Sequence, residues 1–443
     1  MFRISQHMKA LLGQGEAAPA APARGPVRPV VIWNLIRRCN LTCRHCYTTS
    51  ADRDFAGELT TAEAEAVMDD LHAYGVRVLI LSGGEPLMRP DILHLSRRAK
   101  AMGFLTALST NGTLIDAGLA RELADVGYDY VGISLDGLGS THDAFRRRKG
   151  AFEDALRGIR HCLDAGLKVG IRFTLTEENA GDLPGLLDLM AREGVQKFYL
   201  SHLNYAGRGN RNRRRDALRR TTRAAMRMLF ERAWQDAAAG TPRDYVTGNN
   251  DADGAFLWLW ARQQLGPEAA ARLEPGLAAW GGNQTGVGIA NIDNLGNVHP
   301  DSFWWHHSLG NVRERPFSAI WEDGSDPLLA GLRRRPRPVK GRCAGCRFLV
   351  WCNGNTRVRA QQLTGDPWTE DPGCYLTDAE IGLAGGGVGT GRRSREKRPN
   401  GARPQAGTRD SGAAPGPDGT ASGPGTAGEP RGMGEAGAAQ ALG

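Results

Sequence analysis

The sequence has no hydrophobic run close to the roughly 20 residues that a membrane-spanning helix needs. Near the N-terminus, the apolar stretch Ala10-Leu11-Leu12 is also shorter than the about 7 residues at the centre of a secretory signal. The chain also lacks a large excess of charge of one sign. Its 56 basic and 48 acidic residues give a net charge of +8, which is modest for a nucleic-acid-binding chain. We therefore expect a cytoplasmic protein that binds neither a membrane nor a nucleic acid.

Eight cysteines are present, but the reducing cytoplasm argues against a disulfide framework. Seven of them fall into two compact groups, a pattern that is typical of metal ligands. The first group is Cys39, Cys43 and Cys46, and the second is Cys343, Cys346, Cys352 and Cys374. Cys162 stands alone on a predicted helix and is expected to be a small buried hydrophobic residue.

Short β-branched runs alternate with amphipathic segments between residues 30 and 203. The predicted strands are Val30–Ile36, Arg77–Leu81, Leu105–Ser109, Tyr130–Leu135, Lys168–Leu175 and Lys197–His202. The predicted helices are Thr60–Tyr74, Asp91–Met102, Asp116–Val126, Ala151–Ala165 and Leu183–Glu193. Such units predict an α/β fold with a parallel sheet, either an open partial barrel or a doubly wound sheet. In both folds the ligand site lies at the carboxyl ends of the strands.

The first cysteine group has the spacing C-x3-C-x2-C and directly follows the first predicted strand. Three thiolates bind three corners of a four-iron cubane and leave one iron without a protein ligand. A structural zinc ion takes four ligands, and His45, next to Cys46, is poorly placed to supply the fourth. The pattern therefore favours an open-site iron–sulfur cluster.

This spacing after a first strand resembles the signature of the radical S-adenosylmethionine (SAM) superfamily. The resemblance implies a partial (β/α)6 barrel in which SAM binds the free iron and is cleaved to a 5′-deoxyadenosyl radical. It places His45 beside the adenine of SAM. Further SAM contacts are implied at the ends of later strands, at Gly83, Gly84, Glu85, Ser109, Asn111, Ser134, Asp136 and Arg146. Of these, the Gly83-Gly84-Glu85 segment faces the amino group of SAM and Arg146 faces its carboxylate.

The second cysteine group has the spacing C-x2-C-x5-C-x21-C, and four thiolates suit either zinc or a [4Fe-4S] cluster. The order of motifs resembles radical SAM enzymes with a SPASM or twitch domain, which implies one auxiliary [4Fe-4S] cluster. The implied organisation is an N-terminal extension (1–26), the barrel (27–212), a helical linker (213–282), the auxiliary domain (283–381) and a disordered tail (382–443). The tail is rich in Gly, Pro, Ala, Ser and Arg, which cannot form a core.

Longer runs resemble the NirJ family, the radical SAM enzymes of haem d1 biosynthesis. They are Phe2–Ser5, Val31–Cys39, Ser201–Asn210, Val246–Gly254, Asp301–His307 and Cys352–Arg357. The resemblance implies that a sirohaem-derived iron tetrapyrrole, 12,18-didecarboxysirohaem, loses propionate side chains. It also implies a one-electron donor such as flavodoxin or ferredoxin.

Some residues are candidates for contact with such a substrate. His299, His306 and His307 are candidates to ligate its iron or donate a proton, although histidines more often make ordinary hydrogen bonds. Arginines bind carboxylates well, and several are concentrated at Arg208, Arg211, Arg213, Arg214 and Arg215. The alternative for that run is a solvated helix start.

Three other functions are compatible with parts of the pattern. One is oxidative decarboxylation of Fe-coproporphyrin, as in the haem synthase of the alternative pathway. The second is maturation of a peptide by a SPASM enzyme, and the third is a non-catalytic zinc-binding scaffold. The sequence gives no indication of oligomeric state.

Overall fold

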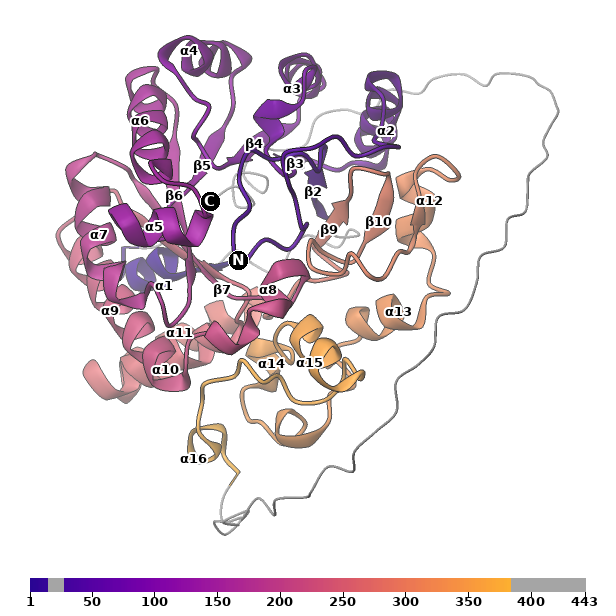
Figure 1. The fold of residues 1–443 in the computed structure, drawn as a ribbon. Coiled ribbons are helices and arrows are strands. Elements are labelled where there is room, and N and C mark those ends of the chain that lie inside the picture. The colour runs from indigo at the N-terminus through magenta and orange to yellow at the C-terminus, as the bar shows by residue number, and fades with distance from the viewer. Residues whose placement is uncertain (15–27, 384–443) are drawn as a thin grey trace, which may run out of the picture. The chain divides into compact units, whose positions relative to one another are not determined.

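The computed structural model describes residues 1–14 and 28–383, and Met1–Leu383 is one compact unit within the described ranges. Figure 1 shows a sheet with helices outside it, an α/β fold. Apart from its first two residues, the predicted tail (382–443) lies outside the described residues. The domain boundaries remain predictions.

Six parallel strands form the centre of the sheet, as predicted. They are β2 (Val30–Asn34), β3 (Val78–Ser82), β4 (Leu105–Thr110), β5 (Tyr130–Ser134), β6 (Val169–Leu175) and β7 (Lys197–His202). Each pairs with the next in chain order. The predicted helices are confirmed as α2 (Thr61–Tyr74), α3 (Ile92–Ala101), α4 (Ala117–Val126), α6 (Ala151–Asp164) and α7 (Leu183–Arg192). Local signals set their ends: Thr60 and Glu63 form a capping box at the start of α2, and Gly75 ends it in the left-handed conformation.

The sheet extends beyond these six strands on both sides. β8 (Asp244–Gly248) lies parallel to β7, and β9 (Ile289–Ile292) lies parallel to β2. β1 (Phe2–Arg3) pairs with β8 in the antiparallel direction. A hairpin follows, with β10 (Asn297–His299) antiparallel to β9 and to β11 (Gly310–Asn311), and through β9 it joins the main sheet.

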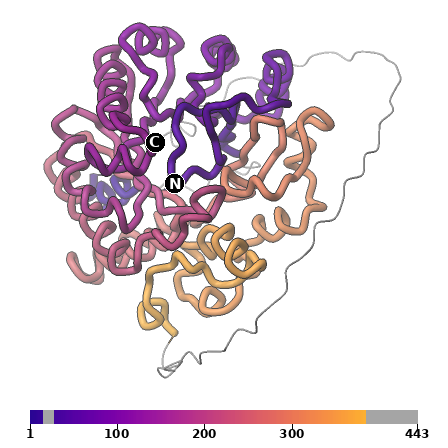
Figure 2. Tube along the Cα trace, viewed as in Figure 1, coloured from indigo at the N-terminus to yellow at the C-terminus, as the bar shows by residue number. Residues whose placement is uncertain are grey.

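The N-terminal helix α1 (Ile4–Leu11) buries Ile4, Met8 and Leu11 and packs against helices from far along the chain (Figure 2). Its neighbours are α9 (Arg219–Ala238) and α11 (Pro267–Trp280), and α10 (Ala252–Gln264) packs against both of them. Segments at the two ends of the described barrel therefore share one core. Within the described ranges no helix combines the length and apolarity required to cross a membrane.

The region that follows β11 consists of short helices. They are α12 (Phe317–Glu322), α13 (Pro327–Arg333), α14 (Leu349–Cys352), α15 (Arg357–Thr364) and α16 (Asp378–Ile381). Buried arginines hold it together: Arg337 donates to Asn283 Oδ1 (2.8 Å) and Thr285 O (2.9 Å), and Arg357 donates to Thr369 O (2.6 Å). Buried polar groups require hydrogen-bond partners. The bonds of these arginines satisfy backbone and side-chain oxygens of separate loops and thereby connect those loops.

Candidate active site

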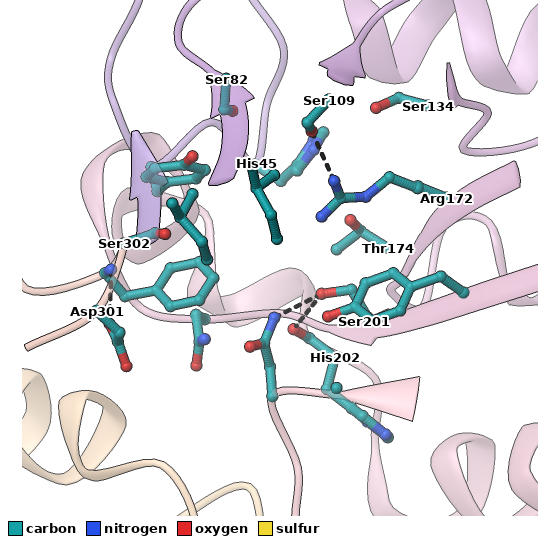
Figure 3. Close-up of a pocket in the computed structure, with 18 of the residues that line it drawn as sticks. His45, Ser82, Ser109, Ser134, Arg172, Thr174, Ser201, His202, Asp301 and Ser302 are labelled. Carbon is teal, nitrogen blue, oxygen red and sulfur yellow. Dashed lines mark hydrogen bonds between the residues drawn. The ribbon is translucent and has the colours of Figure 1, made fainter. Parts of the chain in front are cut away.

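A cavity of about 380 Å³ opens at the carboxyl ends of the parallel strands, where the sequence predicted a ligand site. Polar side chains from successive strands and their loops surround it (Figure 3). They include Ser82 of β3, Ser109 of β4, Ser134 of β5, Arg172 and Thr174 of β6, and Ser201 of β7.

Arg172, Thr174 and Tyr199 were not among the site residues predicted from the sequence, and Ser201 was noted only as the start of a family-like run. Side chains alternate between the two faces of a strand, so Gly170, Arg172 and Thr174 share one face of β6 while Ile171, Phe173 and Leu175 share the other. The apolar set is fully buried, and the polar set reaches the cavity at Arg172 and Thr174. Polar residues at every second position of an apolar run were the signal that could have found them.

The first cysteine group lines this cavity. Cys39 and Cys43 are buried and pack around Leu41, with Cys46 beside them. The sulfurs accept hydrogen bonds from Leu41 N to Cys39 Sγ (3.4 Å) and from Arg146 Nη1 to Cys43 Sγ (3.5 Å). Burial raises the pKa of both thiols, so thiolates at these positions need a nearby cation such as iron.

A buried ion pair contacts the loop that carries the first cysteine group. Asp136 is fully buried, forms an ion pair with Arg146, and accepts a hydrogen bond from Thr174 N (2.6 Å). Burial opposes its ionisation, but the positive charge of Arg146 and the hydrogen bond from Thr174 N favour the carboxylate, and the pKa of Asp136 is lowered. The ring of His45 stacks on Phe145 at 4.7 Å between centroids, and burial lowers the pKa of His45 to about 4, which keeps the imidazole neutral. His45 and Arg146 line the cavity, whereas Asp136 lies behind them.

The Gly83-Gly84-Glu85 segment is locked to the chain that leads into the first cysteine. Gly84 N donates to Ile36 O (2.6 Å) and Glu85 N donates to Arg38 O (2.9 Å). A Cβ on Gly84 would lie 2.2 Å from Arg38 O, so only glycine allows this approach. The two glycines line the cavity and Glu85 does not.

The fully buried Glu85 carboxylate holds the next strand end instead of facing the cavity. It accepts hydrogen bonds from Thr110 Oγ1 (2.6 Å) and Asn111 N (2.8 Å). Burial raises the pKa of Glu85 to about 7 despite these bonds. Asn111 Nδ2 in turn donates to Asn40 Oδ1 (2.8 Å), inside the cysteine loop. The carboxylate therefore aligns backbone around the cavity.

Ser109 and Asn111 line the cavity, as does Ser134. Arg172 Nη1 donates to Ser109 Oγ (2.6 Å; Figure 3). The Arg172 guanidinium also lies 5.2 Å from the centroid of the Tyr199 ring. These two contacts hold a positive charge at the cavity wall.

The three candidate histidines His299, His306 and His307 lie outside the cavity lining. His299 is buried between Asp293 Oδ2 (3.3 Å) and the carbonyl of His307 (2.8 Å), and His307 Nε2 bonds Asp326 Oδ2 (2.8 Å). His306 is exposed. Phe303, three residues before His306 in the sequence, does line the cavity. Its ring contacts the ring of Tyr47 edge-on, with 5.2 Å between the centroids.

The four thiols of the second group line a separate small cavity, together with Asp371. Asp371 is fully buried and forms a bidentate pair with Arg359 at 2.9 and 2.8 Å. Within residues 1–14 and 28–383, no three histidine, cysteine or carboxylate side chains converge as ligands of a single metal ion. The donor set of the second group, four cysteine thiols around one cavity, is one that binds either zinc or a [4Fe-4S] cluster.

The sequence profile of the Radical SAM superfamily matches residues 33–190, which contain the first cysteine group. The chain is 54% identical over 385 residues to "Pre-heme d1 synthase" of Dinoroseobacter shibae, covering 87% of this chain and 94% of that protein. It is 46% identical over 358 residues to "Fe-coproporphyrin III synthase" of Methanosarcina barkeri, covering 80% and 90%. This chain belongs to the radical SAM superfamily. It is therefore a radical SAM enzyme, and its cofactors are SAM and a [4Fe-4S] cluster.

Solved structures support the same fold. SuiB of Streptococcus suis bound to S-adenosylmethionine matches with a TM-score of 0.61 and 17% identity, over 79% of this chain and 78% of that chain. The enzyme anSMEcpe with bound AdoMet matches with a TM-score of 0.61 and 18% identity, over 80% and 95%. At these identities the likeness establishes the radical SAM fold alone.

Proposed function

We propose that this radical SAM enzyme acts in haem d1 biosynthesis, removing propionate side chains from a sirohaem-derived iron tetrapyrrole. The observation that carries the proposal is the 54% identity to pre-heme d1 synthase across 94% of that protein. The cavity agrees with it, because aromatic rings and a fixed arginine lie beside the cysteine loop.

Cys39, Cys43 and Cys46 would hold the SAM-binding cluster, and the cavity-lining backbone of Gly83 and Gly84 would receive the amino group of SAM. When bound, the cluster and SAM supply a 5′-deoxyadenosyl radical that abstracts a hydrogen atom. The chain positions these groups through buried contacts. Arg146 keeps positive charge beside Cys43, where it complements thiolate, and Ser134 lines the adjoining wall.

The remaining cavity wall would bind the tetrapyrrole. Its macrocycle is flat and apolar, which suits Tyr47 and Phe303, and its propionates are anionic, which suits Arg172. Because Ser109 and Tyr199 already hold the guanidinium, Arg172 loses little side-chain entropy when a carboxylate binds. Arg172 is the residue that we assign to substrate carboxylate binding.

The second cysteine group would hold one auxiliary [4Fe-4S] cluster through Cys343, Cys346, Cys352 and Cys374, which share one cavity. Electrons would come from a flavodoxin or a ferredoxin. The segment from Cys352 to Thr356 borders both cavities, so the auxiliary site adjoins the substrate wall.

The test is an anaerobic assay of the reconstituted enzyme with SAM, dithionite and 12,18-didecarboxysirohaem, read by mass spectrometry of the tetrapyrrole. We expect products that have lost propionate chains, with 5′-deoxyadenosine formed in proportion. A parallel assay supplies Fe-coproporphyrin instead, and conversion of that tetrapyrrole alone would contradict the proposal. The Arg172→Lys variant should raise KM for the tetrapyrrole more than it changes SAM cleavage without substrate.

A second candidate is the activity named for the Methanosarcina barkeri relative, which is 46% identical. The same assay decides between the two. Accumulation of Fe-coproporphyrin III as the final product would favour this second activity.

A further inference from the structure

A concentration of exposed arginines begins where α8 (Gly207–Arg211) ends. It continues through a 3-10 turn, Arg213–Arg215, to the start of α9. We define the arginine patch as the exposed residues Arg211, Arg213, Arg214, Arg215, Arg219 and Arg220. The cavity and the SAM-binding contacts do not use these side chains.

The patch adjoins the backbone of the first cysteine group. Arg208 N donates to Cys46 O (2.8 Å) and Arg208 Nε donates to Cys43 O (2.7 Å). Asn212 Nδ2, inside the patch segment, donates to Arg44 O (2.9 Å). One hydrogen bond and one residue therefore separate the patch segment from Cys43. In Figure 1, α8 lies beside the loop that follows β2.

Among the described residues, most of this positive charge has no acidic partner. Glu178 pairs with both Arg44 and Arg215, and Arg213 donates to Asn210 O and Oδ1. Four patch members have no ionic partner among the residues that the structure describes: Arg211, Arg214, Arg219 and Arg220.

The position of two of these arginines is also unfavourable for the fold. Arg219 and Arg220 are the first two residues of α9, whose first turn has no acidic residue. Cations at a helix N-terminus oppose the helix macrodipole. Local rules are most often broken at functional sites, so the placement points to a use for the charge.

We propose that the arginine patch is the docking surface for a small acidic electron-transfer protein of the flavodoxin class. The inference rests on the proposed SAM-binding cluster at the first cysteine group. One electron leaves the reduced flavin of the donor and enters that cluster, and no bond forms or breaks. Complementary charge speeds encounter between such partners, and the short path to Cys43 makes this face the suitable one.

The experiment uses the reconstituted holoenzyme with four substitutions: Arg211→Glu, Arg214→Glu, Arg219→Glu and Arg220→Glu. SAM cleavage is measured with photoreduced flavodoxin and, separately, with dithionite, which needs no docking. At low salt we expect the flavodoxin-supported rate to fall by about tenfold or more, since electrostatic steering changes association rates by that order. The dithionite-supported rate should remain within about twofold of the parent, because the patch lies outside the cavity.

A matched control reverses four exposed arginines elsewhere: Arg97, Arg121, Arg192 and Arg334. It changes the net charge equally and should retain the flavodoxin-supported rate to within about threefold. Replacing the four patch arginines with lysine instead should restore most of that rate.

Three results would overturn the docking assignment. They are an unchanged flavodoxin rate in the patch variant, an equal loss with both reductants, or an equal loss in the control variant. A raised KM for the tetrapyrrole with a normal flavodoxin rate would instead assign the patch to substrate carboxylates. Failure of the parent enzyme to cleave SAM with dithionite would refute the proposed function itself.

Discussion

The two cysteine regions solve different problems with similar components. In the first, three thiols line the large cavity at the strand ends. A cluster bound by three thiolates has one iron without a protein ligand, and the cavity lets a small molecule reach that iron. In the second, four thiols line a small cavity of their own. Ligand number and placement thus separate a reactive site from a closed one.

Each region also has a buried arginine–aspartate pair, and the two arginines differ in what else they contact. Arg146 pairs with Asp136 and donates to Cys43 Sγ, a proposed cluster ligand. Arg359 pairs with Asp371 and donates to Leu203 O (3.2 Å) and Asn249 O (2.8 Å) in loops that line the main cavity. The second pair therefore connects the region of the second cysteine group to the wall of the main cavity.

The largest expected effect comes from removing thiols. Cys43→Ala should abolish SAM cleavage and leave about four irons per chain, of the about eight that two cubanes contain. Cys346→Ala should also lower the iron content but leave SAM cleavage partly intact while tetrapyrrole turnover falls. Iron analysis and 5′-deoxyadenosine assays check both. SAM cleavage by the Cys43 variant would refute the claim that the first cysteine group, and not the second, holds the SAM-binding cluster.

The buried pairs should give the next largest effects. Arg146→Gln and Arg359→Gln each leave an aspartate buried without its partner, which typically costs about 3–5 kcal/mol of unfolding free energy. Only the Arg146 variant should also alter the electron paramagnetic resonance (EPR) signal of the SAM-binding cluster. Denaturant unfolding and EPR of both variants measure this, and equal spectral changes would refute the difference in roles.

The smallest effects should come from two glycines that touch the cysteine segments. A Cβ on Gly84 would meet Arg38 O at 2.2 Å, and a Cβ on Gly282 would meet Cys352 O at 2.5 Å. Each alanine variant should lose about 1–3 kcal/mol through overpacking. Gly84→Ala should raise the Kd for SAM, and Gly282→Ala should not. Gly181→Ala, with no atom within 4 Å of its Cβ, is the control and should match the parent in both measurements.

The sequence predicted the six central strands closely, because each is an apolar run and, from the second strand on, each follows a glycine that ends the preceding helix in the left-handed conformation. It missed β8, a five-residue strand in an Asn-rich segment that is stabilised by pairing with β7. The cysteines were predictable from spacing, which is local. The positions of His299 and Glu85 were not, because their burial depends on contacts with residues from other elements.

The most direct test is EPR spectroscopy of the reduced enzyme before and after addition of SAM. We predict that SAM changes the signal of one cluster, and that Cys43→Ala eliminates this response while Cys346→Ala preserves it. A reduced cluster whose signal is unchanged by saturating SAM would contradict the claim that the first cysteine group leaves an iron open to SAM.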